Sequence, residues 1–252
     1  MNYLPKKKMN ELDDIQYLPI LDYRYERFFR DTHYNGNRLD EATRKKLISI
    51  IDEDVAQYSE SLPMLAKMLD QFKDYDDDGH QMYCVIVSVM QFAIITMIDC
   101  MVIGKYFMLA DCDYDKRFMR GKMKVVLNEG FKKLYGFEEK TRMRSEWNKV
   151  GTIINYFSEE LVLQYKQLSS LLDHHSQTSS WWRDERNMET HLDTEKLYVS
   201  RCEEVVEAQV MLDSLKLFDA LFAVNLFLSN LHSYLRNILL DKYLRGELKE
   251  EE

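Results

Sequence analysis

Residues 81–98 read QMYCVIVSVMQFAIITMI, eighteen consecutive positions without a charged side chain. This length approaches that of a membrane-spanning helix. However, Gln91 lies near the centre of the run, Asp99 follows it, and we find no second hydrophobic span in the sequence to complete a transmembrane bundle. The run therefore favours a central core helix, buried on every side by other helices, over a membrane helix.

Working outward from this run, the composition predicts an all-α fold. The chain of 252 residues contains only eight glycines and three prolines, and all three prolines lie before residue 64. No proline therefore interrupts helical patterning after that point. With 46% apolar residues, the chain can bury a continuous core. We find no strand-like alternation, glycine-rich phosphate loop or internal repeat, which excludes Rossmann and P-loop chemistry.

The predicted helices follow from apolar spacing and from capping and breaking residues. Asp40 is a predicted N-cap, Pro63 suits the first turn of a second helix, and Gly136 should end a helix. We expect helices over residues 40–59 and 63–73, forming a hairpin, and over 81–109, 114–135, 138–172 and 194–244. A polar loop should cover residues 173–180, and a break near Asp213 is allowed.

The two ends of the chain differ from this helical body. Residues 1–39 are aromatic and irregular and end at the turn signal 35–37, so we expect an arm that drapes over the helices. Residues 246–252 should form a solvated acidic tail. One multi-helix domain over residues 40–245, with long central helices, lies between them.

Charge is distributed unevenly along the chain. The net charge of -9 argues against a protein that binds nucleic acid through its whole surface. Residues 116–149, however, hold eleven Lys and Arg against four Glu, a local charge of +7 that leaves -16 on the remainder. Such a basic stripe permits contact with an RNA backbone, although a merely solvated basic face is the commoner case. Its basic members are Lys116, Arg117, Arg120, Lys122, Lys124, Lys132, Lys133, Lys140, Arg142, Arg144 and Lys149.

We predict no metal site, no cofactor and a cytoplasmic protein. The four cysteines form no CxxC pair and no secretory leader begins the chain, so reduced thiols are expected. Residues 74–79 resemble the first half of a calcium loop, but Val85 occupies the position of the bidentate glutamate. The adjacent His174 and His175 do not suit a shared ion.

The candidate catalytic residues lie in the stretch 186–191, which reads Arg-Asn-Met-Glu-Thr-His. A metal-independent ribonuclease needs a group that moves a proton between the ribose 2'-hydroxyl and the leaving oxygen, and His191 titrates in the right range. It also needs a permanent cation on the phosphate, which the planar fork of Arg186 supplies. Asn187 can orient either group by hydrogen bonding.

The spacing of these residues adds a constraint. On one regular helix Arg186 and His191 are about 140° apart, whereas Asn187 and His191 share a face. A single straight helix therefore cannot point the arginine and the histidine into one small pocket. The motif must straddle the start of a helix, or two copies of it must combine across a dimer.

The motif resembles the Arg-Asn-x-x-x-His signature of HEPN domains. Arg186, Asn187 and His191 match the signature, while Glu189 and Thr190 fill permissive positions. The resemblance implies a helical bundle of HEPN-like type, a homodimer with one composite RNA cleft, and metal-independent endoribonuclease activity. A prokaryotic toxin or antiphage defence setting, with a possible antitoxin or defence-system partner protein, also follows from it.

Asp193 departs from one subgroup of this family. HEPN toxins paired with a nucleotidyltransferase antitoxin commonly carry a tyrosine two residues after the histidine, and that tyrosine is modified by the antitoxin. Asp193 holds this position here, which puts that mode of silencing in doubt. A carboxylate near His191 would raise the histidine pKa and favour a general-acid role, or it could cap the following helix.

Two alternatives remain. The same site could belong to a non-catalytic HEPN-like module that binds a nucleotide or a partner protein. The chain could also be a purely structural bundle whose Trp181-Trp182 segment is a docking surface.

Overall fold

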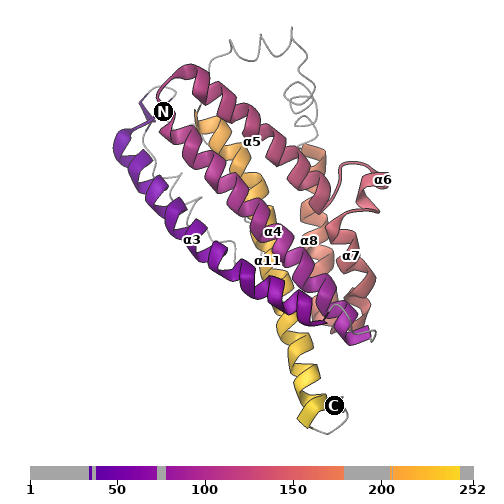
Figure 1. The fold of residues 1–252 in the computed structure, drawn as a ribbon. Coiled ribbons are helices and arrows are strands. Elements are labelled where there is room, and N and C mark those ends of the chain that lie inside the picture. The colour runs from indigo at the N-terminus through magenta and orange to yellow at the C-terminus, as the bar shows by residue number, and fades with distance from the viewer. Residues whose placement is uncertain (1–33, 36–37, 73–77, 179–204, 206, 245–252) are drawn as a thin grey trace.

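The computed structural model describes residues 34–35, 38–72, 78–178, 205 and 207–244. Within these residues the fold is all-α, as predicted, apart from two paired strands of two residues each (Figure 1). The long helices are α3 (Glu41–Phe72), α4 (Asp78–Leu109), α5 (Asp113–Leu134), α8 (Glu159–Thr178) and α11 (Glu207–Leu244). The short ones are α6 (Glu139–Arg142), α7 (Glu146–Ile153) and the 3-10 helix η1 (Ile154–Tyr156).

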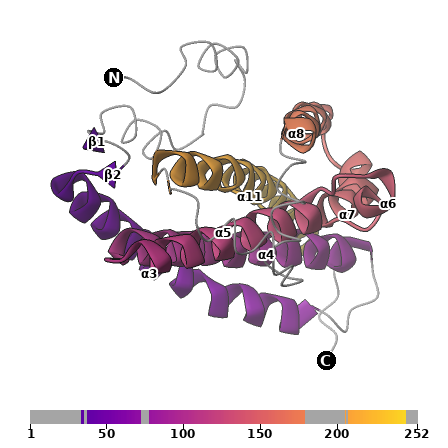
Figure 2. The same cartoon turned by 90° about the horizontal axis from the view of Figure 1, so that it is seen from above.

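Helix α4 is the centre of the bundle and contains the uncharged run. It packs against α3, α5, α7 and α11, and its interior positions such as Ile86, Val89 and Met97 are fully buried. Seen from above, α11 and α8 lie on one side of α4 and α5 (Figure 2). Burial on every side was expected but is wrong, because Ile95 is 42% exposed and Tyr106 is 54% exposed.

Within the part of the chain that the structure describes, two helices are long and apolar enough to cross a membrane by length and composition alone. They are α4 and the stretch Asp213–Ile238 of α11, and each buries about half of its most apolar window inside the bundle. The prediction that the sequence holds no second hydrophobic span is therefore wrong, because Asp213–Ile238 is such a span. The core helix of a soluble protein passes the same test.

The predicted hairpin over residues 40–73 is wrong, because one continuous helix, α3, passes through Pro63. Asp40 caps its start as predicted: its Oδ1 accepts from the backbone N–H groups of Ala42 and Thr43, each at 3.0 Å. Pro63 is exposed, so its ring meets solvent rather than the core. Beyond it Leu65 is buried at 4% exposure, and this packing keeps the helix continuous.

Helix α5 agrees with the prediction within one residue at each end. The Cys112 Sγ accepts from Asp115 N–H at 3.4 Å and caps the start. Gly136 follows the helix with φ of +86°, where a side chain is strained. A Cβ there would also lie 2.6 Å from the backbone nitrogen of Arg142, so this break is fixed by local geometry.

One predicted long helix over residues 138–172 is instead divided into α6, α7, η1 and α8. Ser145 Oγ accepts from Asn148 N–H at 3.2 Å and starts α7. Phe157 is extended, and Ser158 Oγ accepts from Leu161 N–H at 3.4 Å at the start of α8. These serines cap the starts of α7 and α8, while the apolar spacing continues across the breaks. Helix α8 then runs to Thr178, so the predicted polar loop over 173–180 is helical as far as that residue.

At the C-terminal side, α11 is continuous through Asp213, and its last turns extend beyond the other helices (Figure 1). The predicted start of this helix at residue 194 lies outside the described residues. At the N-terminal side, β1 (Tyr34–Asn35) pairs antiparallel with β2 (Arg38–Leu39), with Tyr34 opposite Leu39. The strands flank residues 36–37 of the predicted turn, and β2 contacts α11. The remainder of the expected arm, residues 1–33, and the acidic tail, residues 246–252, lie outside the described residues.

Candidate functional site

The catalytic motif itself lies outside the described residues. This applies to the predicted catalytic pair Arg186 and His191, to the supporting residues Asn187, Glu189, Thr190 and Asp193, and to Trp181 and Trp182. The structure does describe the chain on both sides of this stretch. It ends with Thr178 at the end of α8 and is continuous again from Glu207 at the start of α11. We call residues 179–206 the motif segment.

On its C-terminal side the motif segment leads into a buried ionic cluster, formed by Leu39, Arg44, Lys116 and Glu207. Lys116 Nζ of α5 pairs with Glu207 Oε1, and their side chains are only 4% and 1% exposed. The other carboxylate oxygen accepts the backbone N–H of Leu39 at 2.8 Å. Arg44 Nη2 of α3 lies 3.9 Å from Glu207 Oε1. This Glu207 cluster joins β2, α3, α5 and α11.

A second polar cluster lies at the end of α8, before the motif segment, and consists of Tyr135, Gly136, Arg142, Asp173 and Ser176. Arg142 Nη2 lies 2.7 Å from Asp173 Oδ1 and its guanidinium lies 5.0 Å from the Tyr135 ring centre. Asp173 Oδ1 accepts no hydrogen bond from Arg142, so the contact is an ion pair. The buried Ser176 Oγ donates to the Gly136 carbonyl at 3.3 Å. This Arg142 cluster fixes α8 to the end of α5.

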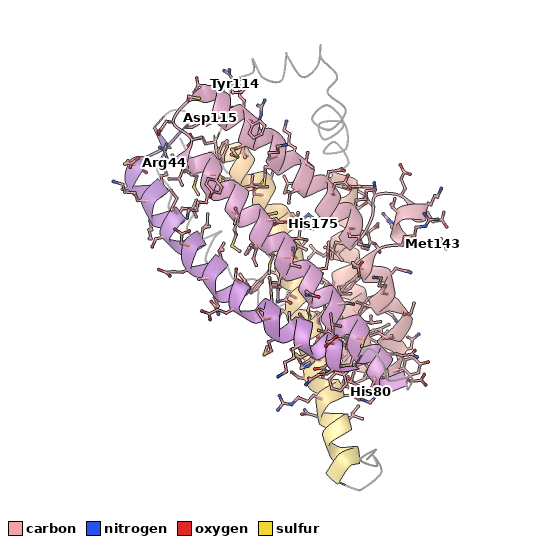
Figure 3. The ribbon with its side chains drawn as sticks, in the orientation of Figure 1. Arg44, His80, Tyr114, Asp115, Met143 and His175 are labelled. Carbon is pink, nitrogen blue, oxygen red and sulfur yellow. The ribbon has the colours of Figure 1, made fainter. Side chains whose placement is uncertain are left out.

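The two clusters lie at opposite ends of α5. Lys116 is in its first turn, whereas Gly136 follows its last residue. Figure 3 shows Arg44 and Asp115 at one end of the bundle and Met143 and His175 farther along it. A helix of 22 residues is about 33 Å long. Both ends of the chain around the motif segment are therefore fixed to α5.

Helix α5 is also the core of the predicted basic stripe, with seven Lys and Arg against three Asp and Glu. The structure shows that the whole stripe is not a free cationic surface. Lys116 is buried in the Glu207 cluster, and Arg142 pairs with Asp173. Lys133 and Lys149 both pair with the buried Glu146, at 2.9 and 2.7 Å. Lys122 is exposed and lies 5.0 Å from the Phe118 ring centre.

The other candidate ligand groups give no metal centre in the described part of the chain. His174 and His175 lie in α8 with ring centres 6.5 Å apart, and His174 is exposed while His175 is half-buried. Of the calcium-like run, residues 74–77 lie outside the described residues, and Asp78 and Gly79 begin α4. Among described residues no group of three or more His, Cys, Asp or Glu side chains could hold a metal ion. Cys84, Cys100 and Cys112 are free thiols.

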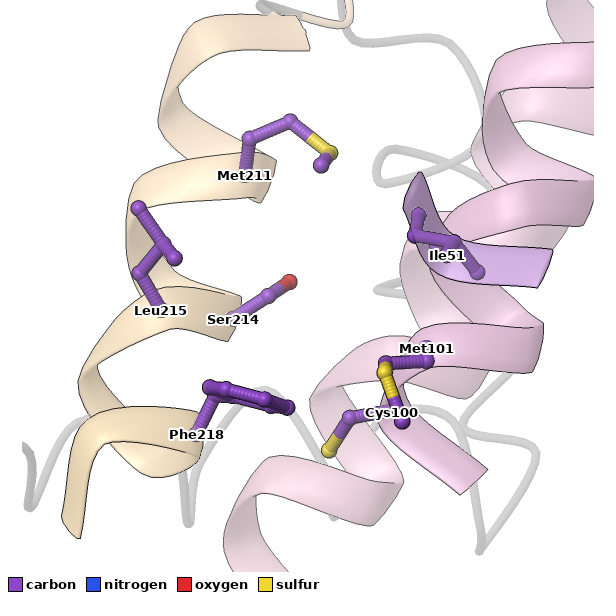
Figure 4. Close-up of a pocket in the computed structure, with 8 residues that line it drawn as sticks. Ile51, Cys100, Met101, Met211, Ser214, Leu215 and Phe218 are labelled. Atoms are coloured by element: carbon purple, nitrogen blue, oxygen red, sulfur yellow. The ribbon is translucent and has the colours of Figure 1, made fainter. Parts of the chain in front are cut away.

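An apolar cavity of about 40 Å³ lies between α3, α4 and α11 (Figure 4). Among its lining residues Ser214 carries the polar atom, and its Oγ already donates to the Val210 carbonyl at 2.7 Å. Ligand pockets for small molecules usually enclose several hundred Å³. The cavity is a gap in packing rather than a substrate site.

A pair of polar residues was missed from the sequence. His232 of α11 and Tyr83 of α4 lie 3.1 Å apart, measured from Nε2 to the hydroxyl oxygen. The spacing of His232 and Arg236, one helical turn apart, is a detectable signal in the sequence. Tyr83 lies 149 positions away from His232, and no local pattern connects them.

The chain was compared with protein-family models, curated proteins and solved structures, and nothing in any of the three sets matches it.

Proposed function

We propose that this protein is a HEPN-type, metal-independent endoribonuclease whose site is built from Arg186 and His191. The proposal rests on the residue types and spacing of the motif and on its resemblance to the HEPN signature. Asn187 orients the pair, and Glu189, Thr190 and Asp193 support it. No cofactor is required, because imidazole and guanidinium groups supply the acid–base and electrostatic parts of the reaction.

One observation carries the proposal beyond the motif. The chain on both sides of the motif segment is fixed to α5, the helix in which basic residues are most concentrated. The same helix thus anchors both flanks of the motif segment and presents exposed cations, such as Lys122, that could bind an RNA backbone. Phosphate neutralisation by such cations is the main source of affinity for RNA.

The proposed reaction is an intramolecular transfer. The ribose 2'-oxygen forms a bond to the adjacent phosphorus, and the bond from phosphorus to the 5'-oxygen breaks. The proton of the 2'-hydroxyl leaves and a proton is delivered to the 5'-oxygen, so the products are a 2',3'-cyclic phosphate and a 5'-hydroxyl. His191 moves the proton, and Arg186 holds the phosphate oxygens as negative charge builds on them.

We further propose that the protein acts as a homodimer. The 140° separation of Arg186 and His191 on a regular helix leaves the site incomplete within one straight helix. A motif that straddles the start of a helix, or a second copy of the motif, would supply the missing half, so this geometry is compatible with the dimer that the HEPN resemblance implies. Cytoplasmic toxin or antiphage activity, with an antitoxin or defence-system partner, is the setting that the HEPN resemblance suggests.

Cleavage of total cellular RNA in EDTA tests the catalytic proposal. The parent protein should cleave RNA and leave 2',3'-cyclic phosphate ends, whereas His191→Ala should lose activity by at least about a hundredfold, because the loss of a general acid or base costs that much. His174→Ala is a matched control: this histidine is exposed on α8, outside the motif segment, so its removal should leave cleavage unchanged. A folded, dimeric parent that cleaves no RNA would show that the proposed activity is wrong.

Complementation tests whether the site is shared between two copies. Co-expressed Arg186→Ala and His191→Ala chains form mixed dimers that contain one intact arginine and one intact histidine in different protomers. We expect such dimers to recover part of the parent activity, whereas each variant alone stays inactive. If the mixed dimers are inactive although they form, each protomer must build its own site.

A non-catalytic module that binds a nucleotide or a partner protein is the second candidate. The observation that favours it is the internal pairing of Lys133, Arg142 and Lys149, which reduces the charge available to a long RNA backbone. RNA binding without cleavage, or nucleotide binding that is lost in Arg186→Ala, would support this candidate over the ribonuclease.

A further inference from the structure

The end of the bundle opposite the Glu207 cluster holds a histidine–tyrosine pair. Tyr83 is buried at 7% exposure in α4, while His232 of α11 is half-buried. In addition to the 3.1 Å contact between Nε2 and the hydroxyl oxygen, their ring centres lie 5.1 Å apart. Phe72, the last residue of α3, packs edge-on against Tyr83 at 4.7 Å. Phe72 of α3 therefore packs on the Tyr83 ring, which in turn contacts the imidazole of His232.

Arg236 lies one turn beyond His232 on α11, so the two side chains leave the helix on the same face. Arg236 is exposed, and among the described residues no carboxylate lies within ion-pair distance of its guanidinium. Burial lowers the pKa of His232 and raises the pKa of Tyr83, and the nearby charge of Arg236 acts to lower the pKa of both groups. Arg236 is a fixed cation beside a proton-accepting ring.

Among the described residues, no carboxylate is one of the groups that shift the pKa of His232. Burial is the larger cause of the lowered pKa of His232, and Arg236 adds to it. On α4 the nearby titratable groups are His80, whose ring lies 5.2 Å from the Phe72 ring, and Cys84, whose pKa is raised by burial. Neither Asp70 near the end of α3 nor Asp78 at the start of α4 is among the groups that shift the pKa of His232.

We propose that Tyr83, His232 and Arg236 form a binding site for a phosphate group, carried by a phosphomonoester or present as free phosphate. The guanidinium fork can hold two phosphate oxygens, and the imidazole can donate to a third once it is protonated. Tyr83 keeps the ring in place and can accept or donate through its hydroxyl. The phosphate would supply the negative charge that the described residues around Arg236 lack.

This phosphate site is separate from the proposed cleavage site. His232 lies 25 positions after Glu207 on one continuous helix, which corresponds to about 38 Å along α11. Figure 3 shows His80, a neighbour of the phosphate site, at the end of the bundle opposite Arg44. Arg236→Gln should therefore leave RNA cleavage by the motif unchanged, so the two proposals can fail independently.

The pKa of His232 measured by NMR tests the proposal. Histidine Cε1 protons are followed through a pH titration of the full chain in sodium chloride, in inorganic phosphate and in 5'-AMP, all at matched ionic strength. Phosphate should raise the pKa of His232 by about half a unit or more, because a bound anion favours the charged ring. His174, exposed on α8, is the internal reference and should titrate alike in all three solutions.

Arg236→Gln is the matched variant, and its exposed position means that the fold should be kept. In chloride its His232 should have a higher pKa than in the parent, since the repelling cation is gone, and phosphate should no longer change that pKa. A larger increase with 5'-AMP than with inorganic phosphate identifies a phosphomonoester as the ligand, and a larger increase with inorganic phosphate identifies free phosphate. The same His232 titration in chloride and phosphate, or an equal phosphate effect in Arg236→Gln, would overturn the proposal.

Discussion

At the scale of single residues, two glycines in the central helices differ in what an added methyl group would meet. A Cβ at Gly104 of α4 would meet only the Met123 methyl at 3.7 Å, and Gly104 lines the apolar cavity. A Cβ at Gly130 of α5 would lie 2.8 Å from the Thr96 methyl and 3.1 Å from Leu217. Both neighbours are buried, so they cannot move aside easily.

We therefore predict that Gly104→Ala stabilises the protein by about 1 kcal/mol, because alanine is the better helix former and fills part of the cavity. Thermal unfolding should show an increase of about 2–4 °C in Tm for a domain of this size. Gly130→Ala gains the same helix propensity but introduces a clash, so it should be destabilising. Equal effects of the two substitutions would contradict this account.

His232 gives the protein a pH dependence with a definite sign. Its pKa in the folded state lies below the ordinary value of 6.5, mainly because of burial. As the pH falls below that value, the unfolded chain takes up a proton before the folded chain does, so the free energy of unfolding decreases. Well above pH 6.5 the group is neutral in both states and the full stability is present.

Denaturant unfolding at pH 7.5 and 5.5 measures this contribution. The loss of stability between the two pH values should be smaller in His232→Gln than in the parent, because glutamine cannot take up the proton. An unchanged pH dependence in that variant would assign the effect to other groups.

At the scale of elements, α3 shows how packing can override a local helix breaker. Pro63 has no N–H to donate to the Ser59 carbonyl, and its ring crowds that group. The helix nevertheless continues for nine residues to Phe72, because residues such as Leu65 pack on the core formed by α4. The sequence predicted two helices here because the signal at Pro63 is local and the compensating contacts are not.

We predict that Pro63→Ala stabilises the protein by about 2 kcal/mol, the ~3 kcal/mol cost of an interior proline less the ~1 kcal/mol that its rigidity contributes through the unfolded chain. Pro63→Gly restores the hydrogen bond without the helix propensity and should stabilise less. Thermal unfolding measures both, and the new amide at position 63, which donates to the Ser59 carbonyl, should be protected from hydrogen exchange. If Pro63→Ala does not stabilise the protein, Pro63 does not destabilise α3 in the folded state.

At the scale of the whole molecule, the Glu207 cluster joins segments that are distant in the sequence. Leu39 and Glu207 are 168 positions apart, and Lys116 and Glu207 are 91 positions apart. A buried charge that loses its partner is costly, whereas replacing both members of a pair is often tolerated. The cluster therefore couples the start of α11, and with it one end of the motif segment, to α5 and β2.

Lys116→Met should destabilise the protein by about 3–5 kcal/mol, because the Glu207 carboxylate remains buried with only the more distant Arg44 to compensate it. The double variant Lys116→Met/Glu207→Gln should recover much of that loss, since the amide oxygen can still accept the Leu39 N–H. Denaturant unfolding of the two variants and of Glu207→Gln alone gives the coupling energy. Strictly additive effects would contradict a direct interaction.

The sequence alone predicted the all-α class, the position of the central helix, and α5 with its end at Gly136. These features depend on a charge-free run, on the absence of proline after residue 63 and on a glycine that is required by its own backbone, all of which are local. The sequence also supplied the motif and its proposed chemistry. The breaks at Ser145 and Ser158 carried a capping signal that the continuing apolar spacing concealed.

Only the tertiary structure decided which polar residues meet. It placed Lys116 against Glu207, Lys133 and Lys149 against Glu146, and Tyr83 against His232. As a result, part of the basic stripe is paired internally. The proposed phosphate site lies at the end of the bundle opposite the Glu207 cluster. Helix formation is controlled by residues within a few positions of one another, whereas ion pairs and hydrogen bonds between helices depend on how distant segments pack.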